Sequence, residues 1–168
     1  AIKAAADRIE APFTRSGGEN SYSLHAELQE ITHNLVGIIR TGSELKEAIE
    51  KIAEIRKRSA NVSVAGGRKF NPGFHLAFDL DNMLLVAEST AKSAISREES
   101  RGGHTRDDFP QLDNKWRQIN HIASFDGNVV SVRKQELPAL PKELFDLFDI
   151  HELEKYMTPD EIAKGGAR

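Results

Sequence analysis

Apolar residues recur at the spacing of an amphipathic helix in three separate stretches of the chain. In each stretch they return every three or four positions, so they share one face of a helix. The residues expected on these faces are Leu24, Leu28, Ile31, Leu35 and Ile38 in the first stretch; Leu45, Ala48, Ile49, Ile52 and Ile55 in the second; and Leu76, Leu80, Met83, Ala87, Ala91 and Ala94, widened by Phe74, Phe78 and Leu84, in the third.

Polar residues and glycines predict where these helices begin and end. Thr41 and Glu44 have the spacing of a capping box, which starts the second helix. Asn71-Pro72 is typical of an N-cap followed by the first helical residue, so the third helix begins there. We expect this helix to run to about Ser100 and to stop at Gly102-Gly103. Three such helices with short connections predict an antiparallel three-helix bundle.

Further along, the pattern predicts a β-hairpin. Residues 119–125 and 128–133 flank Asp126-Gly127, a pair typical of a two-residue hairpin turn. Such a turn would place Ala123 opposite Val130. Because two strands alone are barely stable in water, we expect the hairpin to pack on the bundle or on a partner.

Short helices are expected near the C-terminus. Pro141 can open one that runs through Phe148. Thr158 and Glu161 have the spacing of a second capping box, which predicts a last short helix. Residues 165–168 are expected to fray.

Together these patterns predict a mainly α protein, in which an antiparallel three-helix bundle is followed by a β-hairpin and short C-terminal helices. We assign residues 1–110 to the bundle and residues 111–168 to the tail. Residues 1–20 are interpreted as an Ala-rich stretch followed by a loop.

Composition excludes several kinds of chemistry. The 168 residues include no cysteine, which excludes disulfides, thiolate metal sites and cysteine nucleophiles in this chain and fits a cytoplasmic protein. A net charge of −3 gives no field that would attract nucleic acid. The longest apolar run, residues 83–87, is far shorter than the roughly 20 residues that span a bilayer, so we expect no direct membrane insertion. Because the chain starts at Ala1 rather than at a methionine, we expect a processed or truncated product.

Charged side chains are concentrated at residues 96–110. Arg97 and Arg101 are spaced to share a helix face, and like charges this close need an anion or a carboxylate between them. Gly102-Gly103 would then turn the chain sharply and present His104 from a loop. Three interpretations are open: an ion-pair network that closes a helix end, a contact surface for another domain or subunit, or a catalytic acid–base site. No nucleophile stands in a matching position.

Other candidate sites are weaker. His25 and His33 lie on the first helix with Gln29 midway between them, which supplies no carboxylate ligand, so no metal site is expected. The basic run at residues 56–58 suits the negative end of a helix dipole. It lacks the interleaved aromatic residues of a nucleic-acid site. Trp116 is interpreted as a packing anchor.

Several motifs resemble one known family. The string ESRGGHTRDDFP at residues 99–110 resembles the ESRG-(A/G)-H-x-R-x-DFP signature of the succinate dehydrogenase and fumarate reductase flavoprotein family, of which L-aspartate oxidase carries a close variant. Residues 71–80, NPGFHLAFDL, resemble the opening of the long helix in that family's C-terminal domain. Residues 36–40, VGIIR, resemble the turn after its first helix, and Trp116 with the following hairpin resembles its tail.

The resemblance implies a helical domain that packs on a large FAD-binding domain, with its tail directed toward an iron–sulfur subunit. It implies that the complete subunit oxidises succinate to fumarate through FAD and passes electrons to iron–sulfur centres and quinone, at the cytoplasmic face of the membrane. The family's G-x-G-x-x-G fingerprint does not occur here, so no FAD is expected in this fragment. Catalytic, cofactor-binding and metal-binding residues are expected elsewhere.

The residues assigned to the interface and its ion pairs are Arg97, Arg101, His104, Arg106 and Asp108. Two alternatives to the dehydrogenase are a stand-alone helical protein-interaction module and the equivalent domain of L-aspartate oxidase. The long tail after Pro110 favours the dehydrogenase.

Overall fold

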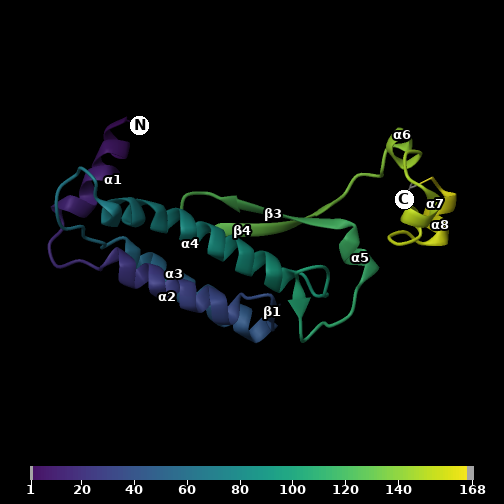
Figure 1. Cartoon of the computed structure of the whole chain (residues 1–168), viewed down its shortest axis with the longest axis horizontal. Helices are drawn as coiled ribbons and strands as arrows, with labels where there is room; N and C mark the ends of the chain where they lie inside the picture. Colours follow the sequence, from purple (N-terminus) through teal and green to yellow (C-terminus); the bar gives the residue numbers. More distant parts are fainter. Residues whose placement is uncertain (1, 166–168) are drawn as a thin grey trace.

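A computed structural model describes residues 2–165 of the chain. The fold is mainly α with a two-stranded antiparallel sheet, which confirms the predicted fold class (Figure 1). The expectation of fraying at residues 166–168 lies outside the described residues. The elements are α1 (Ile2–Thr14), α2 (Ser21–Leu35), β1 (Ile39–Arg40), α3 (Gly42–Ser59), α4 (Pro72–Ser96), β2 (Thr105–Arg106), α5 (Asn114–Arg117), β3 (Ile119–Phe125), β4 (Val130–Glu136), α6 (Lys142–Phe145), α7 (Ile150–Leu153) and α8 (Pro159–Ala163).

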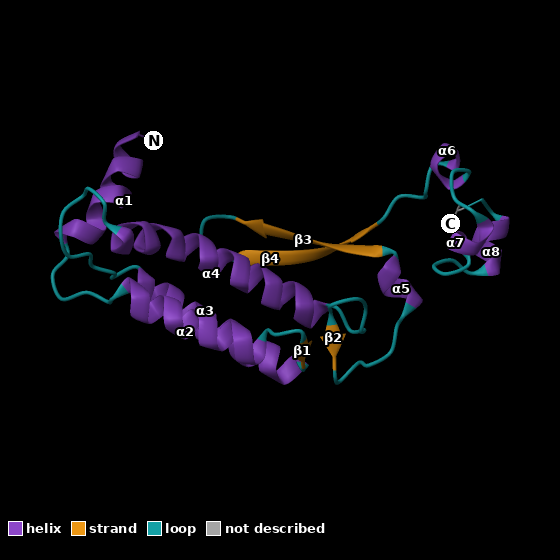
Figure 2. Ribbon diagram, in the orientation of Figure 1, coloured by secondary structure: helices purple, strands orange, loops and turns teal. Residues whose placement is uncertain are grey.

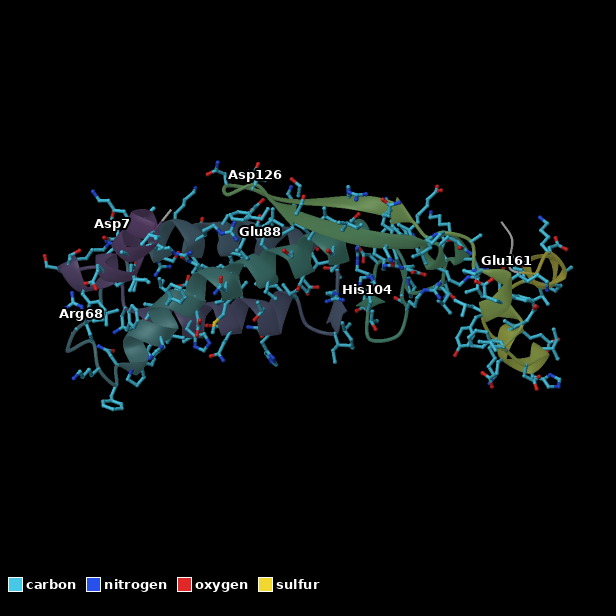
Figure 3. The ribbon with its side chains drawn as sticks, turned by 90° about the horizontal axis from the view of Figure 1, so that it is seen from above. Asp7, Arg68, Glu88, His104, Asp126 and Glu161 are labelled. Atoms are coloured by element: carbon cyan, nitrogen blue, oxygen red, sulfur yellow. The ribbon has the colours of Figure 1, made fainter. Side chains whose placement is uncertain are left out.

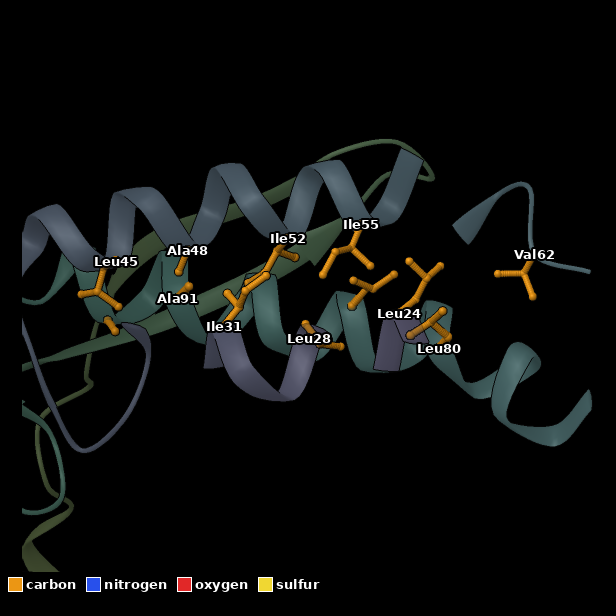
Figure 4. Packing of buried hydrophobic residues seen from close by; sticks show 12 residues of the cluster. Leu24, Leu28, Ile31, Leu45, Ala48, Ile52, Ile55, Val62, Leu80 and Ala91 are labelled. Atoms are coloured by element: carbon orange, nitrogen blue, oxygen red, sulfur yellow. The ribbon is translucent and has the colours of Figure 1, made fainter. Parts of the chain in front are cut away.

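Helices α2, α3 and α4 pack against one another in pairs and form the bundle (Figure 2). The predicted faces of the first two helices point into one hydrophobic core, with Leu24, Leu45 and Ile52 fully buried (Figure 4). From α4, Leu80 and Leu84 complete it. Because each fully buried aliphatic side chain contributes about 1.5–3 kcal/mol, this core is the main source of the domain's stability.

Side-chain caps begin the three bundle helices. The Asn20 carboxamide accepts from the amides of the first turn of α2, and Asn71 does the same for α4. Thr41 and Glu44 form the predicted capping box at α3. Each cap satisfies amide donors that have no partner within the helix.

Helix α4 ends earlier than expected. It stops at Ser96, because Arg97 adopts an extended backbone with φ −96° and ψ 104°. The predicted end near Ser100 is therefore wrong. The reason is tertiary: the Arg106 guanidinium occupies the carbonyl oxygens at the end of α4, which would otherwise accept from further helical amides.

Helix α2 also ends before the predicted face does. Its last residue is Leu35, so Ile38 lies beyond the helix and is 70% exposed. The following strand β1 pairs in parallel with β2, Ile39 opposite Thr105 and Arg40 opposite Arg106. This short pairing, which the sequence pattern did not predict, ties the chain between α2 and α3 to the segment after α4.

The hairpin forms where predicted, but with a different register. Phe125 pairs with Val130, so the loop has four residues and Ala123 lies opposite Val132. The predicted pairing of Ala123 with Val130 is wrong because the Asp126 carboxylate accepts the amides of Asn128 and Val129, which stabilises the longer loop.

The hairpin packs along α4, as expected for two strands that are marginal alone. Glu88 on α4 is 7% exposed and lies between Arg56 and Lys92, at 2.6 Å from each. The Lys92 ammonium also donates to the Val130 carbonyl at 2.7 Å. A buried carboxylate on the core side of α4 thereby links α3, α4 and β4.

The two ends of the chain lie at opposite ends of the molecule (Figure 1). The Ala-rich stretch at the start of the chain forms helix α1, which was not predicted; it packs on α4, where the Phe13 and Phe74 rings are 5.0 Å apart. At the other end, α6 stops at Phe145 rather than at Phe148. The capping box of Thr158 opens α8 as predicted.

Candidate functional site

Glu99 is the centre of the charged segment. Its side chain is completely buried, and Arg97 and Arg101 donate to it at 2.5 Å and 3.0 Å. The amide of Asp113 donates to the second oxygen at 3.1 Å. Burial disfavours the charged carboxylate, but the hydrogen bonds from Arg101, Asp113 and Arg97 outweigh that effect and lower the pKa of Glu99. The carboxylate expected between the two arginines is therefore Glu99, although neither arginine lies on the helix.

Arg106 joins the ends of two helices. Its side chain is 3% exposed, and Nη1 donates to the carbonyls of Ala94 and Ile95 at 3.0 and 3.1 Å. The other guanidinium nitrogens hold both oxygens of Asp108 at 2.7 Å. Asp108 in turn accepts the amide of Gly42 at the start of α3. A cation thus stands at the C-terminus of α4 and an anion at the N-terminus of α3, as the helix dipoles favour.

Gly42 leaves room for the charged pair at the start of α3. A Cβ built there would lie 3.0 Å from both the Arg106 guanidinium and the Asp108 carboxylate, which is closer than ordinary van der Waals contact. A larger residue would therefore require these two side chains to shift by a few tenths of an ångström.

His104 is held as a neutral ring. The Arg40 guanidinium donates to its Nδ1 at 2.7 Å, so Nε2 carries the proton and donates to the Arg97 carbonyl at 3.1 Å. Burial and the charges of Arg40, Arg106 and Arg97 lower the pKa of His104 against the opposing effect of that carbonyl. Both ring nitrogens are occupied, so His104 orients neighbouring groups and is not available as a general base.

Gly102-Gly103 forms a tight turn between Arg101 and His104, whose amides and carbonyls pair with each other at 2.7 and 3.0 Å. Gly102 has φ +57°, which glycine adopts without strain. The turn directs His104 back toward β1. In Figure 3, His104 lies between the bundle end marked by Arg68 and the tail marked by Glu161.

Trp116 closes the site on the tail side. It is 2% exposed, and its ring stacks on His121 with centroids 5.7 Å apart. The Lys134 ammonium lies 4.3 Å from the ring centroid, and the Arg97 guanidinium lies at 5.7 Å. The indole packs as an anchor between the charged segment and the hairpin, in the position where such cations are attracted to its face.

The structure brings all five assigned residues, Arg97, Arg101, His104, Arg106 and Asp108, to one end of the bundle. Sequence reasoning missed the participation of Arg40, which lies in β1, and of Gly42, which is the first residue of α3. The only available signal was the resemblance at residues 36–40. Their juxtaposition depends on the β1–β2 pairing, which is too short to be recognised from a pattern.

The two carboxylates of the site are held by arginines: Arg101 binds Glu99 and Arg106 binds Asp108. Among residues 2–165, no cluster of three or more histidine and carboxylate ligands could hold a metal ion. Over the same residues, no helix has both the length and the apolar character needed to cross a membrane.

The fold and the site define a mainly helical domain whose charged segment holds helix ends together. Residues 25–143 match the family described as fumarate reductase flavoprotein C-term. The chain therefore belongs to this family, the C-terminal domain of succinate dehydrogenase and fumarate reductase flavoprotein subunits, and the resemblance identified in the sequence is confirmed.

Known proteins agree with that assignment. The fumarate reductase flavoprotein subunit of Helicobacter pylori is 30% identical over 85% of this chain and 21% of its own length. The solved apo Sdh1 complex of Mycobacterium smegmatis matches with 46% identity and a TM-score of 0.83, over 97% of this chain and 28% of that one. E. coli quinol fumarate reductase matches with 27% identity and a TM-score of 0.73, over 83% and 25%. The chain thus spans less than a third of these relatives.

Proposed function

We propose that this chain is the scaffold and interface domain of a flavoprotein subunit that oxidises succinate to fumarate through FAD and passes electrons to iron–sulfur centres and quinone. The observation that carries the proposal is the internal pairing of the charged segment. Glu99 and Arg106 bind other parts of the same chain, so they set the shape of the bundle end rather than act on a substrate.

Apolar side chains around the charged segment support an interface. Ile38 and Ile39 are 70% and 65% exposed, and Leu112 is 65% exposed. Exposed aliphatic residues beside a rigid polar network are typical of a surface that another domain covers. The proposed partner at this end is the FAD-binding domain of the same subunit.

The tail is the proposed contact for the iron–sulfur subunit. It extends beyond the hairpin to the end of the molecule away from α1 (Figure 1). The boundary between bundle and tail, placed between residues 110 and 111, stays a prediction. The proposed location is the cytoplasmic face of a membrane, within a complex whose other subunits reach the quinone.

The residues present do not fit FAD. Within residues 2–165, parallel pairing consists of the two-residue strands β1 and β2 and one isolated bridge between Glu19 and Val62, which is too little to form the parallel sheet that holds a dinucleotide. We therefore expect the isolated chain to be colourless and to reduce no dye with succinate. A yellow protein with stoichiometric flavin would contradict this assignment.

Arg101→Ala in the complete subunit tests the interface role. Because Arg101 holds Glu99 and the Asp113 carbonyl, we expect its loss to lower the yield of assembled complex more than the turnover per flavin. Arg133→Ala is the matched control, since Arg133 lies exposed on the hairpin and its side chain donates to Gln135. Lost turnover with assembly intact would show instead that Arg101 serves the chemistry.

A further inference from the structure

A polar pocket lies where α4, β1, the turn at residues 102–103 and β3 meet. Apart from Ala94, its lining residues carry polar side chains, and none of them is a carboxylate. The side chains that matter are Arg40, Ser89, Ser93, Arg97, His104 and His121. An opening lined by guanidinium and hydroxyl groups is the arrangement that proteins use to hold oxyanions.

Among residues 2–165, no carboxylate pairs with the Arg40 guanidinium. Its Nη1 donates to the Val36 carbonyl at 3.0 Å and its Nη2 to His104 at 2.7 Å, both neutral acceptors. Its Nε is buried and has no partner among the described residues. By contrast, the Arg97 guanidinium pairs with the Glu99 carboxylate, which it shares with Arg101. A buried donor left unpaired beside an unbalanced charge costs free energy, which a bound anion would offset.

The neighbouring charges do not compensate for Arg40. Four guanidinium groups, those of Arg40, Arg97, Arg101 and Arg106, belong to this network, whereas Glu99 and Asp108 are its two carboxylates. The network therefore carries excess positive charge at the point where the pocket opens. Burial and the charge of Arg106 also lower the pKa of Arg40, which is the direction expected for a cation that lacks an anionic partner.

Hydroxyl groups face the same space. Ser89 and Ser93 are one helical turn apart on α4, and their side chains form no hydrogen bond with any described residue. The Nε2 atom of His121 contacts the Ser96 hydroxyl at 3.1 Å. These groups can donate to an oxygen atom held by Arg40.

We propose that this pocket binds an oxyanion, a carboxylate or phosphate group, with Arg40 as its charge partner and the hydroxyls of Ser89 and Ser93 as further donors. The inference rests on the pocket alone and does not depend on the proposed flavoprotein function. Two sources share this chemistry: a free anion, or an acidic side chain supplied by the remainder of a longer subunit.

Titration of the 168-residue chain with inorganic phosphate, and separately with acetate, tests the site. Binding is followed by NMR of the His104 and His121 rings and by calorimetry. We expect saturable shifts of these rings, and Arg40→Gln should weaken binding about tenfold or more, as expected for loss of a charge-assisted hydrogen bond. Arg133→Gln removes the same charge from the exposed hairpin and should leave the affinity unchanged. Absence of saturation, or equal weakening by both variants, would overturn the proposal.

Ser93→Ala is a second variant that tests the pocket even if Arg40→Gln fails to fold. Alanine favours the helix, so Ser93→Ala should fold and should bind phosphate several-fold more weakly, about the effect of one hydrogen bond. Unchanged affinity would overturn the role of Ser93.

Repeating the titration on the complete subunit separates the two sources of the anion. Retained phosphate binding identifies a free-anion site, and loss of binding only in the longer protein identifies an acidic side chain from its other domain. Absence of binding in both proteins overturns the site.

Discussion

Glu99 and Arg101 form a two-point contact in which each carboxylate oxygen accepts from a different guanidinium nitrogen, both at 3.0 Å. The carboxylate is buried, whereas Arg101 keeps 32% of its side chain exposed. The pair therefore fixes the chain direction just after α4 while leaving one side of the guanidinium at the surface. This geometry makes Glu99 a more sensitive position than the arginines that bind it.

Glu99→Gln should lower the free energy of unfolding by about 1.5–3 kcal/mol, the range for hydrogen bonds to charged groups. The loss should stay below that of a fully buried ion pair because Arg97 and Arg101 can regain water. Urea unfolding measures it. Glu98→Gln, at the exposed neighbouring position, should change stability by less than about 0.5 kcal/mol. Equal effects of the two substitutions would refute the central role of Glu99.

Asp108 should make stability depend on pH in the acid range. The hydrogen bonds from Arg106 lower the pKa of Asp108 from 3.8 to about 2. Because the folded-state pKa is depressed, Asp108 stabilises the fold fully above its ordinary pKa, and this contribution is lost as the pH falls through about 2. We expect Asp108→Asn to flatten the dependence of unfolding free energy on pH between about pH 4 and pH 2.

The control for that experiment is Asp107→Asn, since Asp107 is the exposed neighbour. Other carboxylates also have lowered pKa values, among them Glu99, which its hydrogen bonds to Arg101 and Arg97 hold in the charged form against the effect of burial. The comparison between the variants therefore matters more than the wild-type slope. Parallel curves for wild type and Asp108→Asn would show that the pair with Arg106 contributes nothing across this window.

Lys92→Met should loosen the hairpin without opening the core. Lys92 joins the buried Glu88 to the Val130 carbonyl, so its loss leaves both acceptors short of a donor. We expect faster hydrogen exchange of the β3 and β4 amides, by a factor corresponding to about 1–3 kcal/mol, with little change in α3. Lys46→Met, at an exposed position of α3, is the control. Hairpin exchange that stays at the wild-type rate would mean that other contacts hold the sheet.

The elements governed by local patterns could be predicted from the sequence. The capping box at Thr41, the Asn71-Pro72 start and the apolar faces of α2 and α3 depend on residues within a few positions of one another. The charged segment was identified from its composition and from its resemblance to a known signature. The convergence of Arg97 and Arg101 on Glu99 was not predicted. The sequence analysis placed both arginines on the third helix, but α4 ends at Ser96, before either of them.

Side-chain contacts that a periodic apolar pattern does not encode account for two of the errors. Arg106 ends α4 from ten positions beyond Ser96, and the Asp126 side chain lengthens the hairpin loop. Glu88 lies on the buried face of α4, where Arg56 from α3 and Lys92 from α4 both pair with it. The helix at residues 2–14 is a different case, because its alanines were a local signal that favours helix formation.

The parallel join of β1 to β2 has a consequence for the order of folding. It connects the segment before α3 with the segment after α4, so it closes only once both helices have docked and the entropy of the intervening chain has been lost. Contacts that form late speed unfolding when removed and leave the folding rate nearly unchanged. We therefore expect Arg106→Gln to act on the unfolding arm of a chevron plot, with the charged end of the bundle the last part to assemble and the first to open.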